Sequence, residues 1–100
     1  MFGPLCRICG LTAGTAAVFL GETRRVTLKW MNEEEAPPEE HLYRVYALFD
    51  AIENEVERVI DAWEKAGKPT QISYPIAATD DKAREMGWPS VAVQKTVAAI

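Results

Sequence analysis

The sequence predicts a small α+β protein, in which an N-terminal β-hairpin packs on one long central helix and is followed by an edge strand and one or two short helices. Two short apolar runs, at 16–20 and 26–30, predict the hairpin, and apolar residues at heptad spacing over 38–66 predict the helix. In 100 residues there is no internal repeat and no long linker, so we expect a single domain.

Residues 1–31 comprise an apolar N-terminal segment and the predicted hairpin. The apolar stretch that ends at Gly21 is interrupted by Arg7 and three glycines, and no clean cleavage site follows it. We therefore expect a buried strand rather than a membrane span or a signal peptide. Further on, Val26, Leu28 and Trp30 alternate with Thr27 and Lys29. This alternation is typical of a half-buried strand, and the glycine-containing connection before it favours a hairpin.

An acidic, proline-containing linker at 32–37 leads into the long helix predicted over 38–66. Pro38 suits the first helical position, and Gly67 followed by Pro69 marks the end. Within these bounds apolar or small residues recur at alternating spacings of three and four, the a/d pattern of a helix that packs along a narrow stripe. The stripe residues are Leu42, Val45, Phe49, Ile52, Val56, Val59, Trp63 and Ala66.

The predicted helix over 38–66 is longer than a compact domain of this chain length would accommodate. At 1.5 Å per residue it would extend roughly 43 Å, whereas a compact domain of this length has a radius of gyration of about 13 Å. We therefore expect the first half of the helix to be covered by the chain's own core and the second half to meet a partner. The predicted interface, which implies a homo-oligomer, consists of Val56, Val59, Ile60 and Trp63.

Residues 67–100 predict one strand and two short helices. Ile72, Tyr74 and Ile76 alternate with other positions, and Pro75 restricts this segment to a sheet edge. Thr79 suits the cap of a short helix over 82–86, which Gly87 would end. Ser90 suits the cap of a last helix, although alternation at Val91 and Val93 leaves a strand open there.

The charge distribution argues against a general nucleic-acid-binding protein. The formal net charge is −4, and phosphate binding requires a basic face. The first 30 residues carry four basic side chains against one acidic one, whereas residues 31–66 carry eleven acidic against three basic ones. These opposite charges could attract one another within a chain or between copies. An acidic helix surface is nevertheless most often simply solvated.

The strongest candidate for chemistry is the pair Cys6 and Cys9 in a Cys-x-x-Cys-Gly sequence. Two thiolates at this spacing can grip a zinc ion, but a structural zinc site needs four ligands, which a symmetric dimer would supply. The alternative is that both cysteines are buried as small apolar residues. Two cysteines cannot build a disulfide framework, so we expect a reducing, cytoplasmic compartment.

The sequence therefore predicts a small non-enzymatic protein-binding module that self-associates through the heptad-patterned helix. No catalytic motif is recognisable, since His41 has no nucleophile arranged beside it by a known spacing. Two alternatives remain open. One is a zinc- or thiol-dependent protein centred on Cys6 and Cys9, and the other is a small accessory protein of the phage or mobile-element type that inhibits a complex or sequesters a ligand.

Overall fold

The chain folds into helices throughout the part that the structure describes. A computed structural model describes residues 1–69 and 76–99. Helices α1 (Phe2–Ile8), α2 (Ala13–Leu20) and α3 (Arg24–Met31) precede the long helix α4 (Glu39–Lys65), and α5 (Asp80–Glu85) and α6 (Val91–Ala99) follow it. The described residues contain no strand, so the prediction of an α+β fold is wrong.

The predicted N-terminal hairpin is a pair of capped helices. The side chain of Thr12 accepts a hydrogen bond from the backbone N–H of Thr15 at the start of α2, and Thr23 accepts one from Val26 at the start of α3. Gly21, which we had expected in a hairpin connection, adopts a left-handed conformation with φ of 72° and ends α2. The expected buried strand before it is likewise replaced by α1 and the first part of α2.

The long helix is confirmed to within one residue at each end. Pro38 is its N-cap and Ala66 its C-cap, and Glu39 and Glu40 place negative charge near the positive end of the helix dipole. The two helices expected after it are also confirmed: Thr79 caps α5, and the Ser90 hydroxyl accepts a hydrogen bond from the Val93 N–H in α6. The predicted edge strand over 72–76 lies almost wholly outside the described residues.

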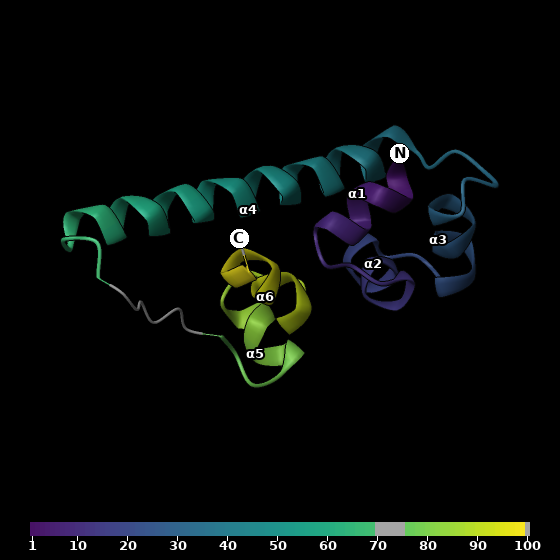
Figure 1. Ribbon diagram of the computed structural model, residues 1–100. Coiled ribbons are helices and arrows are strands. Elements are labelled where there is room, and N and C mark those ends of the chain that lie inside the picture. The colour runs from purple at the N-terminus through teal and green to yellow at the C-terminus, as the bar shows by residue number, and fades with distance from the viewer. Residues whose placement is uncertain (70–75, 100) are drawn as a thin grey trace.

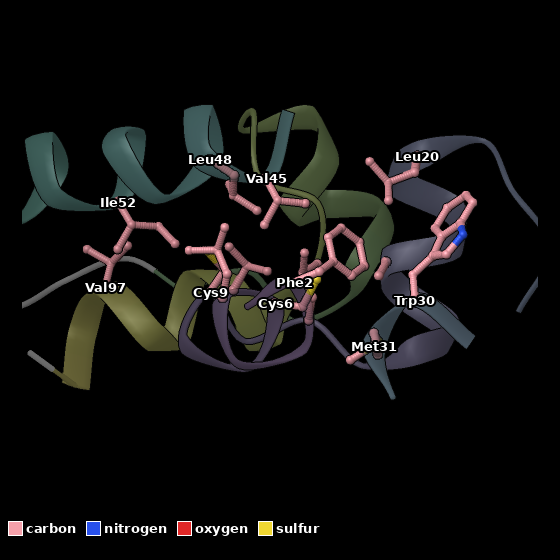
Figure 2. Packing of buried hydrophobic residues seen from close by; sticks show 14 residues of the cluster. Phe2, Cys6, Cys9, Leu20, Trp30, Met31, Val45, Leu48, Ile52 and Val97 are labelled. Carbon is pink, nitrogen blue, oxygen red and sulfur yellow. The ribbon is translucent and has the colours of Figure 1, made fainter. Parts of the chain in front are cut away.

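The core forms where α4 crosses the other helices (Figures 1 and 2). Helix α1 packs against α3 and α4, α2 packs against α3, and α6 packs against α4 and α5. Figure 2 shows Ile52 of α4 beside Val97 of α6, with residues of α1 between α4 and α3. The principal buried apolar side chains are Phe2, Leu5, Cys6, Cys9, Leu11, Ala16, Leu20, Trp30, Met31, Val45, Leu48, Ile52, Val93 and Val97.

Two close backbone approaches fix how α1 sits among its neighbours. A Cβ built on Gly3 would lie 2.1 Å from the carbonyl oxygen of Met31, so α1 touches the end of α3 without room for a side chain. Gly10 has φ of 81°, and a Cβ there would lie 2.4 Å from Oγ1 of Thr96 in α6. Glycine is therefore required at both positions for the N-terminal and C-terminal helices to meet around α1.

Candidate functional site

Helix α4 extends beyond the helices that cover it. Its 27 residues correspond to roughly 40 Å at the standard rise, and the whole molecule measures 48 × 25 × 18 Å. In Figure 1 the C-terminal part of α4 continues past α6, away from the cluster formed by α1, α2 and α3. Among the described helices α4 is the longest, and its C-terminal part is not covered by the helices that pack on its first half.

The four predicted interface residues continue the buried side of α4. Val56 is partly buried against the core, and Val59 is also partly buried. Trp63 is partly buried as well, and its indole Nε1–H donates a hydrogen bond to the carbonyl oxygen of Pro69 at 2.7 Å. Ile60 is 46% exposed. The structure therefore places all four on α4, but it shows contacts within the chain for Val56 and Trp63.

A groove runs along a different side of α4, in the angle between this helix and the turn that joins α5 to α6. Two adjoining hollows of about 570 Å³ and 630 Å³ form it, and both are lined by Leu48, Gly87 and Trp88. The first is closed by Val18 and Phe19 of α2. The second continues along α4 past Met86. The α4 residues that line the groove are Arg44, Ala47, Leu48, Ala51, Asn54, Glu55 and Arg58.

On the α4 side, the middle of this groove is apolar and its ends are charged. On the opposite side, Arg84 of α5 lines the first hollow and is paired with Asp81. Ala47 and Ala51 are exposed, and the buried Leu48 lies between them in sequence. At the α2 end, the guanidinium of Arg44 donates a hydrogen bond to the Phe19 carbonyl oxygen at 2.6 Å and lies 4.9 Å from the centre of the Phe19 ring. At the other end Glu55 and Arg58 form an ion pair.

Two large apolar side chains flank the groove and are open to solvent. Val18 of α2 is 70% exposed beside the Arg44 end, and Met86 is 48% exposed beside the end that holds Glu55 and Arg58. These two side chains stand singly at opposite ends of the groove and extend its apolar lining at each end. Sequence reasoning missed this surface, because it depends on residues of α2 and of the α5–α6 turn that are remote from α4 in the chain.

Cys6 and Cys9 are buried at the end of α1, and each is 0% exposed. Burial raises the pKa of both thiols to about 11, so they are protonated at neutral pH. Among the described residues, no group of three or more potential metal ligands is assembled. A zinc ion shared between two copies through these sulfurs would require α1 to leave the core, since neither sulfur reaches the surface.

His41 is a buried polar residue in the first turn of α4. Its Nε2 lies 3.0 Å from a carboxylate oxygen of Glu22, and its ring packs 5.4 Å from that of Trp30. Its Nδ1 is buried without a hydrogen-bond partner. Glu22 follows α2 and Trp30 belongs to α3. The two contacts of His41 therefore connect the start of α4 to the N-terminal helices.

Comparisons with known proteins found no matching family, no similar curated protein and no similar solved structure. Among the described residues, no single helix is long and apolar enough to cross a membrane. Helices α1 and α2 together have the length and apolar composition of a membrane span, but they are bent by 97° relative to each other.

Proposed function

We propose that this protein is a non-enzymatic protein-binding module that associates with a second copy of itself along α4. The observation that carries the proposal is the amount of α4 surface, on more than one side, that the described helices leave uncovered. Ile60, next to the stripe residue Val59, is exposed, and a groove with an exposed apolar side chain at each end follows another side of the same helix. Regular helix surfaces of this kind suit helix–helix association.

Binding is favoured over catalysis by the state of the reactive side chains. The thiols of Cys6 and Cys9 are buried and protonated, so they are poor nucleophiles and poor metal ligands. The imidazole of His41 is engaged with Glu22 inside the fold. By contrast, the groove and the exposed side chain of Ile60 are accessible to another protein.

The proposal is tested by the mass of the protein in solution. Sedimentation equilibrium over a wide range of concentrations is expected to give a mass that rises toward twice the chain mass of 11.1 kDa. A mass that remains at 11.1 kDa up to the highest soluble concentration would contradict self-association. The Glu57→Lys variant is the control for a change of charge on α4 away from the groove. It is expected to associate like the wild type, because Glu57 is exposed and lines neither hollow of the groove.

A further inference from the structure

The groove side of α4 carries a mirrored order of charges and small residues. From the N-terminal end the order is acid, base, alanine, alanine, acid, base. From the C-terminal end the order is the same, except that each acid is replaced by a base and each base by an acid. The spacings are three or four residues throughout, which keeps all six on one side of the helix. The residues are Glu40, Arg44, Ala47, Ala51, Glu55 and Arg58.

Among pairs related by a two-fold axis, this pattern is complementary to itself only when the two helices run antiparallel. With a two-fold axis at position 49, Ala47 of one copy lies opposite Ala51 of the other, and Glu40 lies opposite Arg58. Arg44 then lies opposite Glu55, to within one residue. Every charged residue of the set meets one of opposite sign, and the contact is repeated on both sides of the axis, as a two-fold interface requires.

Other two-fold arrangements of the same two surfaces place like charges together. A parallel pair in register sets Arg44 on Arg44 and Glu55 on Glu55. An antiparallel pair shifted by one helical turn in one direction sets Arg44 on Arg58, and a shift in the other direction sets Glu40 on Glu55. Because like charges at an interface are repulsive, the pattern favours one direction and one register among two-fold pairs. A parallel pair offset by one turn also avoids like charges, but it is not two-fold and does not close into a dimer.

The shape of the groove agrees with this arrangement. The exposed side chains at its centre, Ala47 and Ala51, are small, so two helix backbones can approach to about 8 Å. The exposed apolar residues also fit. Val18 lies at the Arg44 end of the groove and Met86 at the Arg58 end. A two-fold axis between these ends brings Val18 of each copy toward Met86 of the other.

We infer that the groove of each chain receives α4 of a second copy, antiparallel and centred on residue 49. This inference deepens the proposed function and rests on it, since it identifies which side of α4 associates and in which register. The ion pair between Glu55 and Arg58 within each chain is retained and extended. Arg44 and Glu40 of the other copy join it, so that charges alternate at each end of the interface.

Disulfide cross-linking tests the register. Ala47→Cys chains carrying an affinity tag are mixed with untagged Ala51→Cys chains and oxidised with a copper–phenanthroline complex. We expect the mixed dimer to be the main covalent product, and each variant alone to cross-link far less. Wild-type protein is the background control, because Cys6 and Cys9 are buried. Efficient cross-linking of Ala47→Cys alone would indicate a parallel pair and would overturn the inference.

Charge reversal tests the pairing. Arg44→Glu and Glu55→Arg are each expected to weaken dimerisation by about tenfold or more, because each creates two like-charge contacts in the dimer. The double variant is expected to restore dimerisation. Since the double variant has also lost the Arg44 hydrogen bond to Phe19, restoration cannot come from the monomer fold. A double variant as weak as the single variants would contradict the pairing.

Ile60→Asp separates the inference from the proposed function. Ile60 belongs to the predicted interface with Val56, Val59 and Trp63 and does not line the groove, so this variant is expected to dimerise like the wild type. If Ile60→Asp dissociates the dimer while the groove variants do not, the stripe is the interface; the inference then fails and the proposed function stands. A wild-type protein that is monomeric at all concentrations would remove both.

Discussion

At the scale of single residues, the contact between Glu22 and His41 is expected to contribute to stability. Glu22→Ala would leave both ring nitrogens of a buried imidazole without a partner, since Nδ1 already has none. We expect the free energy of unfolding to fall by about 1–3 kcal/mol. Urea denaturation measures this, with Glu34→Ala at an exposed position as the control. An equal and small loss in both variants would show that Glu22 does not stabilise the buried ring.

The buried thiols give the fold a dependence on alkaline pH. Burial raises the pKa of Cys6 and Cys9 from 9.0 to about 11, so the folded state favours the protonated thiols. Their contribution to stability is complete below pH 9 and is lost as the pH rises to 11. We expect a loss of up to a few kcal/mol over this interval.

The thiol effect can be separated from other groups that titrate at alkaline pH. A Cys6→Ala/Cys9→Ala variant is expected to be less stable at neutral pH, because it loses buried volume. Its stability should nevertheless fall less steeply between pH 9 and 11. Parallel slopes for the variant and the wild type in denaturation experiments would argue against the thiols as the source.

At the scale of helices, the close packing of α1 on α3 depends on Gly3. Gly3→Ala would force a Cβ against the backbone of Met31, and we expect a loss of about 3 kcal/mol. Gly14→Ala in α2 is the matched control, because the nearest atom to its Cβ would be 3.9 Å away. We expect that change to stabilise the protein by up to about 1 kcal/mol. Thermal denaturation distinguishes the two, and similar losses in both would contradict a special role for Gly3.

The sequence indicated the helices from α4 onward but not those before it. In α4 the apolar spacing extends over more than seven turns, and proline and glycine mark both ends, so one period fits and no other does. The segment 26–31 is too short for its apolar pattern to distinguish the period of a helix from that of a strand. Alternation predicts burial of Val26, Leu28 and Trp30, whereas the structure buries Thr27, Trp30 and Met31.

The caps of α2 and α3 were the signal that could have corrected the prediction. Thr12 and Thr23 each precede an eight-residue helix and accept a hydrogen bond from its first turn. Threonine also suits strands and turns, and apolar runs of five residues are compatible with either a strand or a short helix. Packing of α2 against α3, and of α3 against α1, accompanies the helical form, and the contact between α1 and α3 is not local in sequence.

At the scale of the whole molecule, α4 connects two groups of helices and carries the surface on which we propose that a second copy binds. That Val56, Val59, Ile60 and Trp63 lie on one long helix could be predicted from the helix period, whereas their role as an interface stays a prediction. The groove could not, because α2 and the α5–α6 turn form its walls. The order of charges and alanines from Glu40 to Arg58 can be found in the sequence. The groove in the structure is needed to show that this side of α4, rather than another, is the candidate binding surface.

The most direct test of self-association along α4 is sedimentation equilibrium of Ala51→Arg beside the wild type. Ala51 is exposed in the single chain, so arginine is accommodated there without disturbing the fold, which circular dichroism verifies. We predict that the wild type approaches twice the chain mass of 11.1 kDa. Ala51→Arg is predicted to remain at the mass of a single chain. Equal masses for the two proteins, whether both are monomers or both are dimers, would contradict an interface centred on this side of α4.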